Sequence, residues 1–158
     1  MRLTTYTDYT LRTLMYLGVN PGRPATIAEV ARAYGISQAH LMKVVHQLGT
    51  AGDIETTRGR SGGIRLARPA GEINLGAVVR RTEADLDLVP CFGDGEACAI
   101  RCVCSLRTVL NEALAAFLAV LDRVTLADLL MPRRGIAAAL GLTVPVSAGT
   151  PGSRGAQP

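Results

Sequence analysis

Cysteine is missing from every part of this sequence except one short stretch. All four cysteines lie within residues 91–104, and the rest of the 158-residue chain has none. A disulfide framework spreads its cysteines along a short secreted chain, so this clustering argues against one. The sequence also lacks both a long apolar run and the basic, then apolar, N-terminus of a signal peptide. We therefore expect a cytoplasmic protein that has reduced thiols and no membrane partner.

Sequence patterns typical of catalysis are missing as well. The chain has no Ser-His-Asp arrangement, no phosphate-binding glycine loop and no paired carboxylates that a cleft would bring together. We therefore predict that the protein is not an enzyme.

Basic residues are present but unevenly distributed. Residues 1–68 contain nine Arg or Lys and four Asp or Glu, whereas residues 69–158 contain eight and nine. The first part therefore carries a net charge of +5 and the second a net charge of −1. A basic N-terminal half favours a polyanionic partner such as nucleic acid, although a well-solvated surface would give the same balance.

Apolar residues at helical spacing predict three helices near the N-terminus, over residues 8–18, 26–34 and about 37–51. Thr7 or Asp8 can cap the first helix, and a capping-box sequence opens the second. A glycine-containing turn joins the second helix to the third, whose outward side is polar. This pattern is typical of a helix-turn-helix, and an ordinary helical hairpin is the alternative.

Two short β-runs follow, over residues 54–57 and 63–66, and the loop between them contains Arg58 and Arg60 among glycines. A hairpin directly after a recognition helix is a wing. Glycine lets the backbone approach a surface, and arginine suits the narrow, negative minor groove. The combination favours a protein that binds duplex DNA.

The second half of the chain is predicted to be helical. A helix is expected over residues 74–83, and a long one follows from Leu106, with apolar residues at positions 106, 109, 110, 113, 114, 117, 118 and 121. So wide an apolar stripe exceeds what a small domain can cover, so we interpret it as a dimerisation helix, with packing inside one chain as the alternative. A short helix is expected over residues 127–130, and an apolar turn over 136–142.

The predicted fold is mainly α with a small β-hairpin wing: a winged helix-turn-helix followed by a long dimerisation helix. We divide the chain into a DNA-binding domain (residues 1–70), a cysteine loop with the dimerisation helix (71–130) and a flexible C-terminal tail (131–158). The tail is assigned from its content of Gly, Ala, Pro and Ser.

The cysteine spacing, C-x6-C-x3-C-x-C, favours an iron–sulfur cluster over zinc. Structural zinc sites usually take their ligands as close pairs such as C-x2-C, and this stretch has none. Cluster ligands can be spaced more widely along a loop. Spacing alone leaves zinc as the alternative, and it leaves open whether Cys102 or Cys104 is the last ligand.

Several short motifs together resemble one family. They are Met1-Arg-Leu-Thr4, Thr7-Asp-Tyr9, the wing Arg58-Gly-Arg-Ser-Gly-Gly63, the cysteines Cys91, Cys98 and Cys104, and two segments within residues 114–129. With these motifs, residues 1–130 resemble the IscR/NsrR-type winged-helix repressors, and within them the NsrR nitric-oxide sensors. The resemblance implies a homodimer that binds a palindromic operator in double-stranded DNA.

The resemblance also implies a cofactor and a signal. Each subunit would hold one iron–sulfur cluster, 4Fe–4S rather than 2Fe–2S, on Cys91, Cys98 and Cys104 and on Asp8 of the partner subunit. Nitric oxide attacking this cluster would release the operator and derepress genes of nitric-oxide detoxification. By the same resemblance, DNA contacts fall on Ser37, Gln38, His40 and Lys43 in the recognition helix, and on Arg58 and Arg60 in the wing.

Two features depart from the family pattern. Relatives that use a histidine ligand carry it three residues after the last cysteine, where this chain has Arg107, so a histidine-ligated 2Fe–2S centre is not expected. Cys102 stands where relatives usually have a small residue. Two other functions remain as alternatives: a RirA-like repressor that responds to iron status, and a non-regulatory iron–sulfur redox protein.

Overall fold

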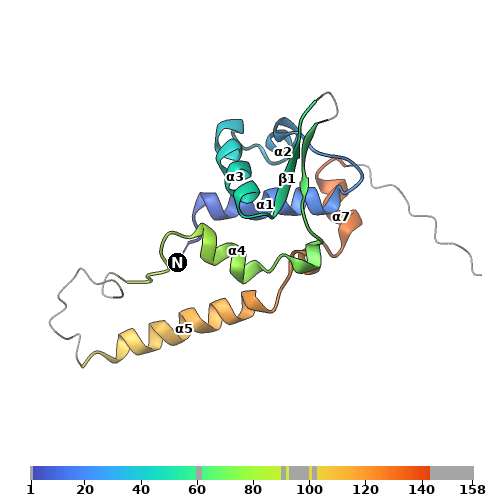
Figure 1. The fold of residues 1–158 in the computed structure, drawn as a ribbon. Coiled ribbons are helices and arrows are strands. Elements are labelled where there is room, and N and C mark those ends of the chain that lie inside the picture. Colours follow the sequence, from blue (N-terminus) through green and yellow to red (C-terminus); the bar gives the residue numbers. More distant parts are fainter. Residues whose placement is uncertain (1, 60–61, 90–91, 93–99, 101–102, 143–158) are drawn as a thin grey trace, which may run out of the picture.

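Helices make up most of the computed structural model, which describes residues 2–59, 62–89, 92, 100 and 103–142. In chain order the elements are α1 (Thr5–Val19), α2 (Ile27–Tyr34), α3 (Gln38–Thr50), β1 (Ile54–Thr57), β2 (Gly63–Leu66), the 3-10 helix η1 (Ala70–Glu72), α4 (Leu75–Thr82), α5 (Ser105–Asp122), α6 (Leu126–Leu129) and α7 (Arg133–Ala139) (Figure 1). The predicted fold class, mainly α with a β-hairpin wing, is confirmed.

Helix α1 lies at the centre of the fold and begins earlier than the sequence predicted. Its cap is Thr4, whose side-chain oxygen accepts a hydrogen bond from the backbone N–H of Thr7 at 3.2 Å. The prediction of a cap at Thr7 or Asp8 is therefore wrong, and Asp8 lies in the first helical turn. Helix α1 packs against α3 on one side and α4 on the other.

The helix-turn-helix is formed by α2 and α3, as predicted. Thr26 and Glu29 form a capping box at the start of α2. Gly35 ends the helix with a φ of 65°, a conformation that favours glycine. On α3, Leu41, Val44 and Leu48 are buried against the rest of the domain, so the opposite side of this helix faces outward.

The predicted wing is an antiparallel hairpin in which Ile54 pairs with Leu66 and Thr57 pairs with Gly63. The residue before α2 joins this hairpin, because the backbone groups of Ala25 and Ile64 exchange hydrogen bonds of 2.9 and 2.8 Å. A side chain at position 63 would lie 2.6 Å from the carbonyl oxygen of Ala25, so glycine permits this close approach. The wing is thereby fixed to the helix-turn-helix.

Helix α5 is joined to the rest of the chain mainly at its C-terminal end. Asp122 accepts a hydrogen bond of 2.7 Å from Arg80 of α4, and its backbone carbonyl accepts one of 2.7 Å from Asn74. A Cβ atom at position 76 would lie 1.9 Å from the Asp122 carboxylate, so Gly76 allows the two helices to meet. Figure 1 shows the other half of α5 extending past the helices above it.

The C-terminal part of the described chain differs from its prediction. The sequence indicated only an apolar turn at residues 136–142, and the structure has a helix, α7, over Arg133–Ala139. Ala137 is buried, and Ile136 and Leu140 pack against the core. Residues 143–158 lie outside the described residues. Within the part described, no helix is both long enough and apolar enough to span a membrane.

Candidate functional site

The outward side of α3 carries the residues predicted to contact DNA. Ser37 is the N-cap residue and its side chain makes no capping hydrogen bond. Gln38, His40 and Lys43 are all exposed. All four predicted residues are therefore accessible at the start of α3, and we call this exposed part of the helix the reading surface.

Met42 also belongs to the reading surface, and the sequence analysis missed it. Its side chain is 55% exposed. An apolar side chain in a major groove can contact the methyl group of thymine. The spacing of the buried residues contains this signal, because position 42 lies at least 100° around the helix from each of Leu41, Val44 and Leu48.

The wing tip carries Arg58, which is exposed and directly follows β1. Gly59 beside it has a φ of 106°, a conformation that favours glycine. Arg60, the second predicted wing contact, lies outside the described residues.

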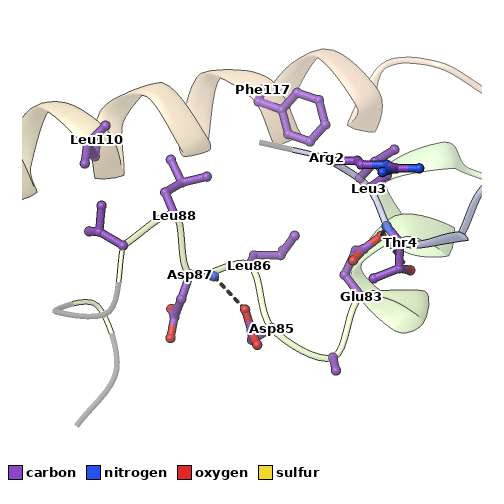
Figure 2. A pocket seen from close by; sticks show the side chains of 12 residues that line it. Arg2, Leu3, Thr4, Glu83, Asp85, Leu86, Asp87, Leu88, Leu110 and Phe117 are labelled. Carbon is purple, nitrogen blue, oxygen red and sulfur yellow. Dashed lines mark hydrogen bonds between the residues drawn. The ribbon is translucent and has the colours of Figure 1, made fainter. Parts of the chain in front are cut away.

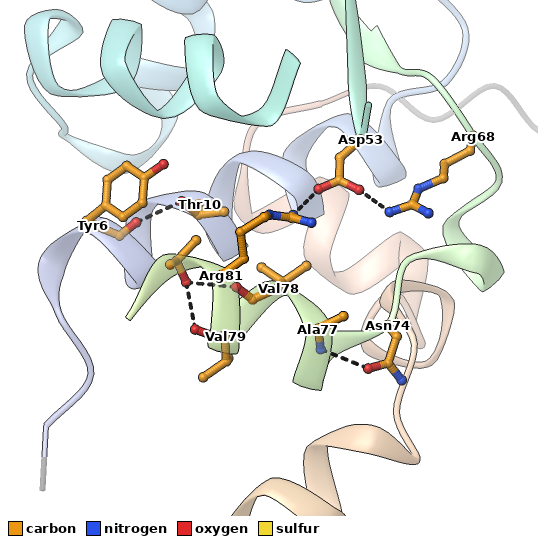
Figure 3. Close-up of polar contacts among 10 residues, drawn as sticks. Tyr6, Thr10, Asp53, Arg68, Asn74, Ala77, Val78, Val79 and Arg81 are labelled. Carbon is orange, nitrogen blue, oxygen red and sulfur yellow. Dashed lines mark hydrogen bonds and ion pairs between the residues drawn. The ribbon is translucent and has the colours of Figure 1, made fainter. Parts of the chain in front are cut away.

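A buried carboxylate connects the base of the wing to α4. Asp53, between α3 and β1, is fully buried. It accepts hydrogen bonds from Arg68, just after β2, and from Arg81, near the end of α4 (Figure 3). The two arginine side chains are each more than one-third exposed. We call these three residues the Asp53 clamp; the sequence analysis missed it.

The start of α1 is bonded to the end of α4. The backbone N–H of Thr4 donates to the carboxylate of Glu83 at 2.9 Å, and its hydroxyl donates to the same oxygen at 3.2 Å. The hydroxyl of Thr7 donates to that of Thr82 at 2.8 Å. Asp8, the predicted ligand, therefore lies in a helical turn that is fixed to the segment leading toward the cysteines.

The Asp8 carboxylate is accessible and is paired within its own helix. It accepts a hydrogen bond of 2.9 Å from the guanidinium of Arg12, one turn away, and about half of each side chain is exposed. This bond raises the pKa of Arg12. Arg12 in turn lies 5.7 Å from the ring centroid of Tyr34. Exposed pairs at this spacing contribute only about 0.3–0.5 kcal/mol, so Asp8 can exchange this partner at little cost.

Of the predicted cysteine ligands, Cys104 is described and Cys91 and Cys98 are not; Cys102 also lies outside the described residues. Cys104 is the N-cap residue of α5, half-buried and not in a disulfide. Among the residues that the structure describes, no three His, Cys, Asp or Glu side chains come together as a metal site.

A hollow of about 500 Å³ marks where the chain leaves α4 toward the cysteines. It lies between residues 83–89 and α5, and Figure 2 shows Leu88 on one side with Leu110 and Phe117 on the other. Val89 at its edge is the last described residue before the first cysteine. The residues that precede the cysteine stretch therefore lie beside α5, and the residues that follow it begin α5.

Comparison with known proteins decides the family. Residues 3–132 match Rrf2, described as an iron-dependent transcriptional regulator. The chain belongs to the Rrf2 family. NsrR of Bacillus subtilis (strain 168), an HTH-type transcriptional regulator, is 51% identical over 138 residues, which are 86% of this chain and 94% of NsrR.

Solved structures agree with this assignment. CymR, the global cysteine regulator of B. subtilis, is 26% identical with a TM-score of 0.67, over 82% of this chain and 95% of CymR. IscR of T. potens has a TM-score of 0.68 over 84% and 88% of the two chains, and its 24% identity supports the fold alone. The chain is a DNA-binding repressor of NsrR type, and the predictions of this family and of a non-enzyme are confirmed.

Proposed function

We propose that this Rrf2 regulator binds a palindromic operator only while it holds an iron–sulfur cluster, and that nitric oxide is its signal. The observation that carries the proposal is that all four cysteines lie in one stretch between α4 and α5 of a chain half identical to an NsrR. The regulated genes would be those of nitric-oxide detoxification.

The chemistry of the described donors fits such a cluster. Cys104 offers an unpaired thiol and Asp8 an accessible carboxylate. Cys91 and Cys98 would supply the other thiolates, and Asp8 would come from the partner subunit. A 4Fe–4S cluster on three thiolates would need a fourth ligand, which the Asp8 carboxylate would provide, and the cluster would supply the reactivity toward nitric oxide. In this role Asp8 exchanges its bond with Arg12 for a bond across the dimer.

Hydrogen bonds provide a path from this region to the DNA-reading parts. Thr4 and Thr7 connect the turn that carries Asp8 to the end of α4. From there Arg81 reaches Asp53, which lies between α3 and β1. A displacement of Asp8 therefore acts on elements that are directly bonded to the recognition helix and the wing.

A homodimer built on α5 is the third part of the proposal. No residue of this 18-residue helix is buried. Leu110 and Phe117 lie on the inner side of the helix, at the hollow, whereas Leu106, Val109 and Val120 are more than half exposed. An apolar side of this extent is covered by a second copy in a dimer, whose two-fold symmetry matches a palindromic operator.

The DNA contacts follow from the reading surface and the wing. Gln38 and His40 are proposed to meet base edges in the major groove, and Ser37 and Lys43 to meet phosphates. Arg58 and Arg60 are proposed to enter the minor groove.

Iron status is the competing signal, because the family is described as iron-dependent. A protein of this second kind would lose its operator affinity when iron is removed, and would keep it when nitric oxide is added to the loaded protein. Binding to the operator under the two treatments separates the signals.

The ligands are tested by anaerobic preparations of single variants, analysed for iron and sulfide. C104A should lose most of the bound iron and C102A should keep it; the reverse would make Cys102 the third ligand. D8A should change the cluster spectrum, whereas R12A, which breaks the same ion pair but keeps the carboxylate, should not. Wild-type protein that contains zinc and no sulfide would refute the proposal.

A further inference from the structure

A second hollow, of about 400 Å³, lies between the first two turns of α1 and the recognition helix α3. Three of its lining residues come from α1 and three from α3: Thr5, Tyr6, Tyr9, His40, Lys43 and Val44. It is separate from the hollow at the root of the cysteine stretch, with which it shares no residue. Two of its residues, His40 and Lys43, belong to the reading surface.

The surface of this hollow is mostly apolar, and among the described residues Lys43 is the one lysine or arginine that lines it. Val44, one of its lining residues, is 1% exposed. The ring of Tyr9 packs on the imidazole of His40, with ring centroids 6.1 Å apart and an angle of 40° between the planes. Lys43 is exposed, and within the described residues it forms no ion pair. No carboxylate lines the hollow.

We propose that this hollow seats one phosphate and deoxyribose unit of the operator backbone, so that α1 contacts DNA together with α3. The inference rests on the proposed role of α3 as the recognition helix. Lys43 carries an ammonium group and Thr5 and Tyr9 carry hydroxyl groups, which suit a phosphate, and the aromatic rings that also line the hollow suit the apolar side of a sugar. The hollow also shares His40 and Lys43 with the reading surface. DNA whose bases face the reading surface would therefore place its sugar-phosphate backbone beside the hollow.

The seat gives Lys43 a defined partner and adds two residues, Thr5 and Tyr9, that the sequence analysis did not consider for DNA binding. Lys43 pairs with the phosphate, and the hydroxyl groups of Tyr9 and Thr5 donate hydrogen bonds to its oxygens. Tyr9 also holds His40 in place beside the bases. Asp8 directly precedes Tyr9 on α1, so a movement of the helical turn that carries Asp8 would also move Tyr9 and change the shape of the hollow.

The test compares Y9F with Y34F for binding to an operator duplex over a range of salt concentrations. Y9F keeps the ring on His40 and loses one hydroxyl donor, so we expect affinity to fall about 3- to 10-fold on all sequences. K43A should reduce the slope of log K against log salt by about one. Y34F is the matched control, because Tyr34 is half-buried on α2 and does not line the hollow.

Duplexes with a single neutral methylphosphonate locate the contact. At the seated phosphate, the neutral linkage should weaken wild-type binding and remove the effects of Y9F and K43A, as expected for groups that act together. If Y9F and Y34F have equal affinity for every duplex while Q38A weakens binding, the proposed phosphate seat is refuted and the assignment of α3 as the recognition helix is kept. If neither Y9F nor Q38A changes operator binding, the assignment of α3 fails.

Discussion

At the scale of single residues, the side chain of Glu29 both caps a helix and forms an ion pair. Its carboxylate accepts hydrogen bonds from the backbone N–H of Thr26 at 2.7 Å and from the guanidinium of Arg23. Arg23 and the Thr26 backbone together lower the pKa of Glu29 from 4.5 to about 2. The same residue therefore closes the capping box of α2 and neutralises a neighbouring cation.

We expect E29Q to remove an acid-dependent part of the stability. The folded pKa of Glu29 is lowered, so its contribution is complete above pH 4.5 and is lost as the pH falls toward about 2. Glutamine keeps the capping bond and loses the ion pair, which for an exposed pair is about 0.2–1 kcal/mol. Urea unfolding at pH 6 should show wild type more stable than E29Q, and the difference should vanish near pH 2. A difference that is the same at both pH values would contradict this role.

Arg58 is the residue on which the proposed role of the wing depends. We expect R58A to weaken operator binding about 5- to 100-fold, with the larger effect on A·T-rich sites, because their narrow minor groove attracts arginine. R65A is the control: Arg65 is an exposed arginine of β2 that pairs with Glu55 at 2.5 Å, and its removal changes the net charge by the same amount. Fluorescence anisotropy at matched salt measures both variants. Equal affinities for R58A and R65A would show that the wing tip makes no specific contact.

At the scale of elements, the sequence correctly predicted those features of the helices that depend only on residues close together in the chain. The capping box of α2, the polar outward side of α3 and the extent of α5 follow from nearby residues. The start of α1 was wrong because Thr4, Thr7 and Asp8 are all residues that cap helices. Glu83, far away in the sequence, bonds to Thr4, and no local pattern contains that information.

Long-range contacts explain the other omissions. The Asp53 clamp joins residues that are 15 and 28 positions apart, and any of its members alone looks like an ordinary surface charge. Helix α7 is only seven residues long and has Ile136 as its one large apolar residue, and Ala137 is buried because of its contact with the core. The division of the chain at residues 70 and 130 stays a prediction.

The Asp53 clamp should contribute to stability more than an exposed ion pair does. D53N replaces a buried carboxylate that accepts from two arginines, so we expect a cost of about 1–3 kcal/mol. The cost stays below the 3–5 kcal/mol typical of fully buried pairs, since both arginine side chains are more than one-third exposed. E55Q, which breaks the exposed pair with Arg65, should cost less than about 1 kcal/mol.

Urea denaturation measures both variants, and D53N should also reduce operator affinity because the wing loses its connection to α4. Equal stability of D53N and E55Q would show that the clamp is not a structural connection. A destabilised D53N with unchanged operator affinity would separate the stability of the clamp from its proposed role in DNA binding.

At the scale of the whole molecule, the exposed side of α5 is the surface on which the dimer depends. V109E places a charge at a position that is 59% exposed in the single chain and would be covered in the dimer. We expect the dimer dissociation constant to rise on the order of 100-fold, about 2.7 kcal/mol. N111E is the matched control, because two residues along a helix place it about 160° around from Val109. Analytical ultracentrifugation distinguishes the variants, and a V109E protein as dimeric as N111E would place the interface elsewhere.

The central claim is that cluster chemistry controls the DNA-reading parts. The most direct test follows operator affinity and cluster absorbance together while nitric oxide is added to the anaerobic wild-type dimer. We predict that affinity falls about 5- to 150-fold, the usual range of coupling between two sites, in step with the loss of absorbance. Loss of the absorbance with operator affinity unchanged throughout the titration would contradict the account.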